Sequence, residues 1–247
     1  MRRSKASQLL ASILVNAIYA MKNYPIMMVN AFVSPLAFLI VLTLVSRGAL
    51  FGVAVIGGLI MALTSSGLSL QGDLVHFKVD FKLQDMVVSS PTTAFIYLFG
   101  MAISELIYYL PGIAVLLAMA FINLKFGLFP TLQVTGAMIL MFVLATALGF
   151  MLSTHISDIM ESWAVTGVVS ILLSTIPPVY YPITYIPLPY RYAAYLSPTT
   201  YAAQIAQQAM GYIHFPQVTI DIDWIVLIGV SMVLLLISAK KTRWREI

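Results

Sequence analysis

The sequence predicts an all-α integral membrane protein that crosses the bilayer six times. Of its 247 residues, 61% are hydrophobic and 9% are charged, whereas soluble domains carry roughly 25% charged residues. The hydrophobic residues gather in runs close to the length of about 20 residues that a membrane-spanning helix needs. A soluble fold of this length has too little interior to hide so much apolar surface.

The first 25 residues are predicted to form an amphipathic helix that lies in the membrane interface. Polar residues such as Lys5, Gln8 and Asn16 share one face of this helix. The apolar residues recur at helical spacing on the other face: Leu9, Leu10, Ile13, Leu14, Ala17, Ile18 and Met21. The alternative is a cleaved signal peptide, because the start is basic and the stretch ending at Ala20 weakly resembles a cleavage site. The amphipathic pattern favours the interfacial helix.

Six apolar runs follow and are predicted to span the membrane. They cover residues 27–45, 50–70, 94–120, 132–152, 163–176 and 224–239. The fifth run stops at Pro177 and Pro178, because adjacent prolines cannot continue a regular helix. The second run is rich in Gly, Ala and Ser, which let helices approach closely in lipid. We therefore expect the second span at the centre of the bundle.

The segment 177–223 is too apolar for a free loop and too rich in proline for a span. Eight tyrosines lie between its prolines, and tyrosine favours the boundary between membrane and water. Irregular backbone at membrane depth is tolerated where it is buried in protein or faces a water-filled cavity. We predict short re-entrant or interfacial helices on the exterior side, with Asp221 and Asp223 as polar flanks that cap the last span.

The distribution of basic residues predicts the orientation. In a six-span layout, ten of the 13 Lys and Arg residues fall on one side: Arg2, Arg3, Lys5, Lys22, Lys78, Lys82, Lys240, Lys241, Arg243 and Arg245. Cytoplasmic segments carry such an excess. Both termini are therefore predicted to be cytoplasmic, in a multi-pass protein of the cytoplasmic membrane. The net charge of +4 then reflects topology and does not indicate binding of nucleic acid.

The charged stretch at 72–91 follows the second span and is cytoplasmic in this topology. Its charged residues alternate with apolar ones, as in segments that dock into a groove on a soluble partner. The candidate docking residues are Phe77, Lys78, Phe81, Lys82, Leu83, Asp85 and Met86. The alternative is a solvated loop that lies on the lipid headgroups.

Two regions resemble the type-2 ABC exporter permeases. The run from Lys82 to Thr93 is similar to the family's short amphipathic helix before the third span, including its small residue and proline. The stretches 178–187 and 195–201 resemble the broken segment that precedes the last span. The amphipathic start and the six-span layout agree with the family as well. The chain departs from the family at a frequent arginine, where it has Gln204, Gln207 and Gln208.

The resemblance implies an ATP-driven exporter of a drug, a lipid-like molecule or another amphiphile. Two permease chains, identical or related, would pair around the substrate path, and each would rest on a cytoplasmic ATPase that pushes the segment 72–91. The chain has no G-x-x-x-x-G-K-[ST] loop to hold phosphates. ATP and magnesium are therefore expected on the separate ATPase subunit, with no cofactor and no catalytic residue in this chain.

An acidic residue in the third span is the first candidate for the substrate path. Glu105 lies near the middle of its span, where a charge is costly and commonly functional. Tyr108 and Tyr109 follow within one helical turn and can reach its carboxyl group. Tyr180 and Tyr181 of the broken segment complete the candidates for the path or the dimer seam. The alternative is a structural Glu105 that is protonated or paired with tyrosine.

Other chemistry has weaker support in the sequence. His155, Asp158 and Glu161 have the spacing of metal ligands, but a polar turn with an acidic helix start explains them equally, and no metal site is expected. An ion-coupled carrier would show related halves and more charges inside the membrane. A membrane-embedded enzyme would need a nucleophile and a base, or metal ligands. Both remain alternatives to the exporter subunit.

Overall fold

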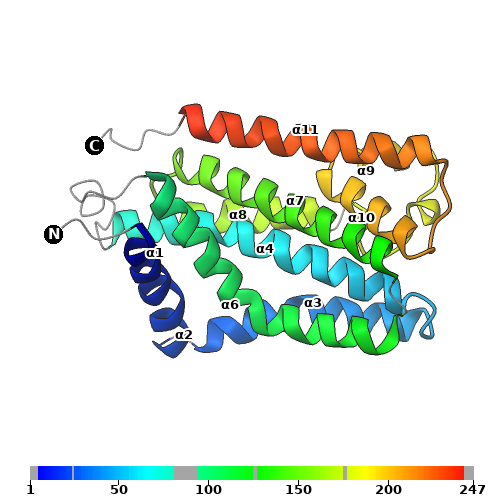
Figure 1. Cartoon of the computed structure of the whole chain (residues 1–247), viewed down its shortest axis with the longest axis horizontal. Coiled ribbons are helices and arrows are strands. Elements are labelled where there is room, and N and C mark those ends of the chain that lie inside the picture. Colours follow the sequence, from blue (N-terminus) through cyan, green and yellow to red (C-terminus); the bar gives the residue numbers. More distant parts are fainter. Residues whose placement is uncertain (1–4, 24, 81–93, 125–126, 175–176, 242–247) are drawn as a thin grey trace.

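The computed structural model describes residues 5–23, 25–80, 94–124, 127–174 and 177–241, and within these ranges it contains helices and turns but no β-strand. Six helices of 16 residues or more run side by side along the long axis of the described part (Figure 1). They are α3 (Pro25–Val45), α4 (Phe51–Val79), α6 (Ala94–Asn123), α7 (Leu128–Ser153), α8 (Ile159–Ser174) and α11 (Gln217–Lys241). The all-α prediction is confirmed.

Four helices of the described residues are long and apolar enough to cross a membrane. These are α4, α7, α6 from Ile96 and α11 as far as Ser238. The apolar stretches of α3 (Pro35–Val45) and of α8 are shorter. The 16 residues of α8 rise about 24 Å, somewhat less than the hydrocarbon core of about 30 Å. The chain is thus a multi-pass membrane protein, and six crossings stay a prediction.

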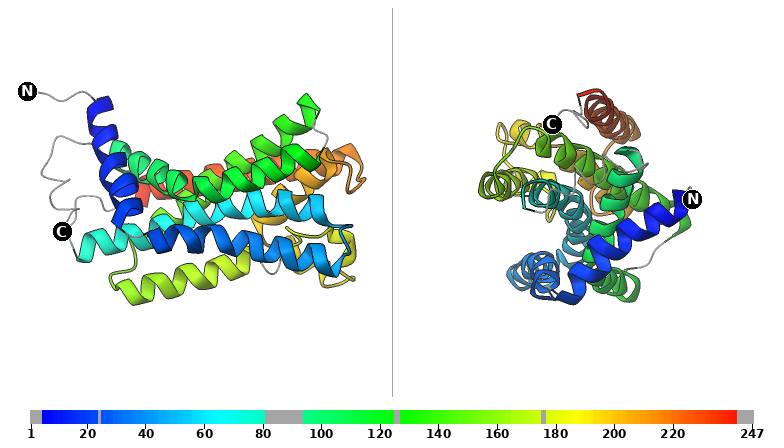
Figure 2. Two further views of the ribbon diagram at one scale, coloured as in Figure 1. Left: turned by 90° about the horizontal axis from the view of Figure 1, so that it is seen from below. Right: turned by 90° about the vertical axis from the view of Figure 1, so that its left-hand side faces the viewer.

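The two ends of the bundle differ in character. At one end, α1 (Lys5–Ile13), a π-helical turn (Leu14–Tyr19) and α2 (Ala20–Asn23) lie across the long helices, where α1 packs against α6 (Figures 1 and 2). The last turns of α4 and α11 lie at this end too (Figure 1). At the other end lie a short 3₁₀ turn (Ile183–Tyr185), α9 (Arg191–Ala194) and α10 (Pro198–Ala209). The described basic residues that are predicted to share one membrane face therefore share one end of the bundle: Lys5, Lys22, Lys78, Lys240 and Lys241.

Helix α4 lies at the centre of the bundle, as its small residues predict. It packs against α3, α6, α7, α8 and α10, and every residue from Gly52 to Thr64 is buried. Its closest neighbour is α7, because Gly67 and Gly149 let the two backbones meet: a Cβ atom at Gly149 would lie 2.9 Å from the Gly67 carbonyl oxygen. Such close approach is how helices associate in lipid, where apolar side chains gain nothing from leaving the solvent.

Buried polar side chains add hydrogen bonds between the helices. Ser238 of α11 donates to the Ala147 carbonyl of α7 at 2.8 Å. The Gln71 amide of α4 donates to the Ser162 carbonyl of α8 at 3.1 Å. Each bond ties two helices together at a point where lipid could not replace the partner.

Two helices run further than the sequence predicts. Helix α4 continues through Val79, so residues 72–79 of the predicted coupling segment belong to the second long helix. The polar residues there find partners within the helix or beside it, for example in the 2.8 Å pair between His76 and Asp80. Helix α11 begins at Gln217, so Asp221 and Asp223 lie inside it and do not cap it. Asp221 is exposed, but Asp223 is 2% exposed, so the prediction of a polar flank was wrong for Asp223.

The close contact between α4 and α7 predicts different outcomes for two glycines. Replacing Gly149 by alanine puts a methyl group against the backbone of α4, and we expect the free energy of unfolding to fall by about 1–3 kcal/mol. Gly229→Ala in α11 is the matched control, because a Cβ atom there meets nothing within 4 Å. Thermal unfolding in detergent measures both, and equal midpoints would contradict the proposed contact.

Candidate functional site

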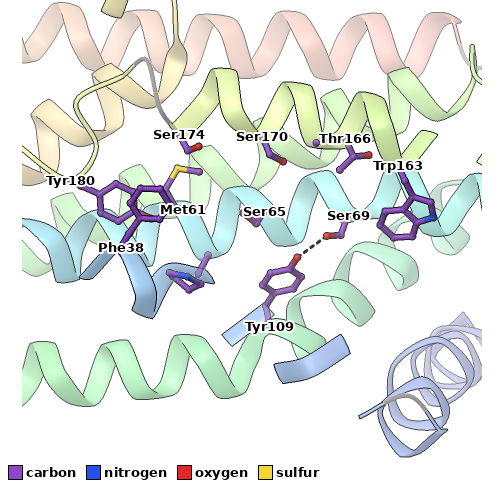
Figure 3. A pocket seen from close by; sticks show the side chains of 13 residues that line it. Phe38, Met61, Ser65, Ser69, Tyr109, Trp163, Thr166, Ser170, Ser174 and Tyr180 are labelled. Atoms are coloured by element: carbon purple, nitrogen blue, oxygen red, sulfur yellow. Dashed lines mark hydrogen bonds between the residues drawn. The ribbon is translucent and has the colours of Figure 1, made fainter. Parts of the chain in front are cut away.

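A groove of about 320 Å³ opens along α4 and is the main candidate site (Figure 3). Its walls come from α3, α4, α6 and α8, with Tyr180 from the segment that follows α8. All of these helices belong to the long bundle, so the groove is set into the membrane-embedded part of the protein. Ligand sites commonly form in such spaces between the helices of a bundle.

Hydroxyl groups line two facing walls of this groove. Ser65 and Ser69 on α4 lie four residues apart, as do Thr166, Ser170 and Ser174 on α8. This spacing brings side chains to one face of a helix, and the two rows face the space between α4 and α8 (Figure 3). None of the lining residues carries a charge.

The hydroxyl groups differ in their hydrogen bonds. Ser69 Oγ and the Tyr109 hydroxyl lie 2.8 Å apart and link α4 to α6. Thr166 donates to the Ser162 carbonyl at 2.9 Å, and Ser174 donates to the Ile171 carbonyl at 3.5 Å. No hydrogen bond of Ser65 or Ser170 is found in the part of the chain that the structure describes. These two hydroxyl groups therefore remain available in the groove.

Aromatic rings stand at both ends of the groove. Trp163 lies at the end near the start of α8. At the other end, the rings of Phe38 and Tyr180 stack with centroids 5.1 Å apart and an interplanar angle of 10°. Gly57 of α4 allows this arrangement, because a Cβ atom there would collide with the Val179 carbonyl oxygen. The segment that carries Tyr180 thus lies directly against the backbone of the central helix.

The three glutamines of α10 hold the surrounding irregular segment. Gln207 donates to the carbonyls of Pro178 at 3.1 Å and Tyr181 at 3.3 Å. Gln208 accepts from the Phe215 amide at 2.9 Å. These are the positions at which the sequence departs from the family that it resembles, where an arginine is frequent. Their role was missed in the sequence, although three amides on one helix beside a proline-rich stretch are a signal for bonds to unpaired carbonyls.

Gln204 of α10 hydrogen-bonds to the buried carboxyl group of Asp223 in α11. In the amide orientation that suits both of its ends, it donates to the Asp223 oxygens at 2.9 and 3.2 Å and accepts from the Tyr195 hydroxyl at 3.3 Å. This contact explains why Asp223 is buried inside α11. A carboxyl group in such a place needs a donor to offset the loss of water.

Glu105 lies behind the groove and does not line it. Its side chain is 6% exposed and hydrogen-bonds to the carboxyl group of Asp73. The contact between these two carboxyl groups joins α6 to α4. Of the other candidates for the path, Tyr109 and Tyr180 line the groove, whereas Tyr108 and Tyr181 are not among its lining residues.

Two of the predicted docking residues, Phe77 and Lys78, lie in the last turns of α4, and the others follow it in the sequence. Phe77 packs beside Leu70, Tyr97 and Met101, and Lys78 is exposed. Phe81, Lys82, Leu83, Asp85 and Met86 lie outside the described residues. Phe77 is therefore part of the packed interior where α4 meets α6, and of the two described residues Lys78 is the one that faces outward.

The polar turn between α7 and α8 has a structural explanation. Asp158 accepts from the Glu161 amide at 2.9 Å and caps the start of α8, as one of the two sequence interpretations holds. His155 lies 2.8 Å from the Met151 carbonyl through Nδ1. No group of three metal-binding side chains is found among the described residues.

Comparison with known families gives one match. A model of a family described as ABC-2 type transporter matches residues 8–210, which is more than half of the chain. The matched range includes every wall of the groove and the glutamines of α10. No match to a curated protein was found.

The contact between Glu105 and Asp73 predicts that two substitutions of Glu105 differ in their effect on stability. Glu105→Gln keeps a donor for Asp73, so we expect the unfolding midpoint to stay close to that of the unchanged protein. Glu105→Ala leaves Asp73 without this partner, and we expect a loss of about 1–3 kcal/mol in the free energy of unfolding. Thermal unfolding in detergent distinguishes them, and an equal loss in both variants would mean that the bond to Asp73 is not what stabilises this contact.

Proposed function

Because the chain belongs to the ABC-2 type transporter family, we propose that it is the membrane-spanning subunit of an ATP-driven exporter of amphiphilic molecules. A chain of this family is a membrane permease component of an ABC transporter. The proposal adds export, pairing with a second permease chain, identical or related, and two separate ATPase subunits that bind ATP and magnesium. The observation that carries it is the family match over a bundle with four helices able to cross a membrane.

The position of α4 supports coupling through the segment 72–91. This helix contributes Ser65 and Ser69 to the groove and runs on to Val79, immediately before Phe81, Lys82, Leu83, Asp85 and Met86. Helix α6 begins at Ala94, just after these residues. A partner that pushes the intervening segment would therefore act on the ends of two neighbouring helices at once.

Contacts between α4 and α6 would carry such a push toward the groove. The two helices pack against each other and are joined by the Asp73–Glu105 pair and by the bond between Ser69 and Tyr109 at the groove wall. Phe77 packs in the same contact, nearer the end of α4. These links let the pair of helices move as one unit relative to α3 and α8.

In this proposal the groove is the part of the substrate path that this subunit supplies, and the second permease faces it. Tyr109 and Tyr180 contact the path directly. Glu105 and Tyr108 act behind the wall, and Tyr181 acts through the segment that holds Tyr180. Six crossings, an interfacial α1 and re-entrant helices at the exterior end complete the layout, with both termini in the cytoplasm. The gathering of the basic segments at one end of the bundle supports this orientation.

A docking test separates this proposal from transport without an ATPase. In a complex co-purified with its ATPase, Phe81→Ala removes an aromatic anchor, and we expect association to weaken by about tenfold or more, with a matching loss of ATP turnover. Tyr192→Ala is the control, since Tyr192 is 69% exposed and belongs to α9 at the opposite end. Transport by the purified chain alone, without ATP, would overturn the proposal.

The orientation predicts the accessibility of two exposed positions. The chain has no cysteine, so single substitutions give unambiguous labelling. A membrane-impermeant maleimide should label Tyr192→Cys on intact cells, and Lys78→Cys only after the membrane is permeabilised. Labelling of Lys78→Cys on intact cells would place the docking segment out of reach of a cytoplasmic ATPase.

A further inference from the structure

The groove holds hydroxyl groups that the described part of the protein does not use. Ser65 and Ser170 stand on opposite walls of the groove (Figure 3), and no hydrogen bond of either is found among the described residues. A lipid chain cannot supply an acceptor for them, and polar groups left unpaired in hydrocarbon are costly. An occupant with oxygen atoms that accept or donate hydrogen bonds would satisfy both hydroxyl groups.

Charge narrows the chemistry of that occupant. No Asp, Glu, Lys or Arg lines the groove. The nearby acidic pair is engaged, since Glu105 is buried and bonded to Asp73. Arg191 is engaged elsewhere, where it donates to the Ile186 and Thr184 carbonyls at 3.1 and 3.3 Å. An anionic headgroup would lose water here without gaining a counter-charge, which is strongly unfavourable. A cationic headgroup would find no counter-charge either, and could gain only the faces of the aromatic rings at the ends of the groove.

The volume of the groove fits a compact headgroup, and the aromatic rings at its ends fit an apolar part of the same molecule. Its volume of about 320 Å³ is at the lower end of the range for ligand sites, roughly 300–1,000 Å³. The rows of hydroxyl groups occupy its middle, and the Phe38–Tyr180 stack and Trp163 stand at its ends (Figure 3). Along α8, Thr166 and Ser174 are separated by about 12 Å of helix.

We infer that the groove binds the uncharged, hydroxyl-bearing headgroup of an amphiphile, of the kind that an alkyl glycoside represents. The Ser65 and Ser170 hydroxyls hydrogen-bond to the headgroup from two sides, and the aromatic rings pack against its apolar faces and chain. The inference rests on the proposed function in that it names the class of molecule that the exporter carries.

The test compares three photoreactive probes on the purified chain in phosphatidylcholine nanodiscs, with no ATPase present. The probes share one alkyl chain with a diazirine next to the headgroup, and they carry a glucoside, a trimethylammonium or a sulfate group. Labelled residues are identified by mass spectrometry. We expect the glucoside probe to label the groove walls of α4 and α8 several times more strongly than either charged probe.

A double variant tests the two hydroxyl groups. Ser65→Ala/Ser170→Ala removes two hydrogen bonds to the headgroup, and we expect groove labelling by the glucoside probe to fall about tenfold. The unfolding midpoint should not change, because neither hydroxyl has a partner in the described part of the protein. The control is Thr131→Ala at the start of α7, where the hydroxyl donates to the Gly127 carbonyl and does not line the groove.

Three results would overturn the inference. A charged probe could label the groove as strongly as the glucoside, or the double variant could leave glucoside labelling unchanged. In the third result, no probe would label the groove, and two chains that carry Ser170→Cys would cross-link to each other. The groove would then be an interface between two copies of the chain. None of these results involves the ATPase, so each leaves the coupling test above to decide the proposed function separately.

Discussion

The close contact of α4 with its neighbours is the constraint on which the rest of the structure depends. Helix α4 packs against five other helices, with glycine at the closest contacts and large buried side chains such as Ile56, Leu59 and Ile60 elsewhere. At Gly67 and Gly149 the backbones of α4 and α7 touch. At Gly57 the irregular segment after α8 touches α4 in the same way. These contacts fix the positions of the groove walls, because α4 forms one wall and places Tyr180 at the end of the groove.

Polar groups inside this bundle fall into two classes. The first class has partners, either on the same helix, as with Thr64 and the Ile60 carbonyl, or on another element, as with Gln207 and the Pro178 carbonyl or Ser238 and the Ala147 carbonyl. Such pairs stabilise the fold, because lipid offers no replacement for either member. The hydroxyls of Ser65 and Ser170 belong to the second class, since they contribute nothing visible to folding. The Thr43 and Thr146 hydroxyls also have no partner among the described residues, but they are buried and do not line the groove, whereas Ser65 and Ser170 do.

The sequence predicts the architecture of the bundle more accurately than it predicts the contacts between side chains. Hydrophobic runs, proline and charge identify the long helices and the central position of α4, because these features follow from the lipid solvent. The ends of α4 and α11 were misplaced because charged residues usually mark the end of an apolar run. Here Asp73 and Asp223 are matched by Glu105 and Gln204 on other helices. A partner distant in sequence leaves no local pattern, so the groove and the carboxyl pair could not be derived, whereas the glutamines beside the proline-rich stretch were a signal that was missed.

The packing also indicates where a movement of α4 can be absorbed. On the side of α7 the contact is between backbones and glycines, and close-packed backbone leaves no room to slide without collision. On the side of α8 the Gln71 amide is bonded to the Ser162 carbonyl, but the two rows of hydroxyl groups face each other across an open groove, where space for movement remains. A push at the end of α4 therefore changes the width of the groove more readily than the contact with α7. The same small side chains that allow α4 to be buried thus make one of its faces rigid and leave the other able to respond.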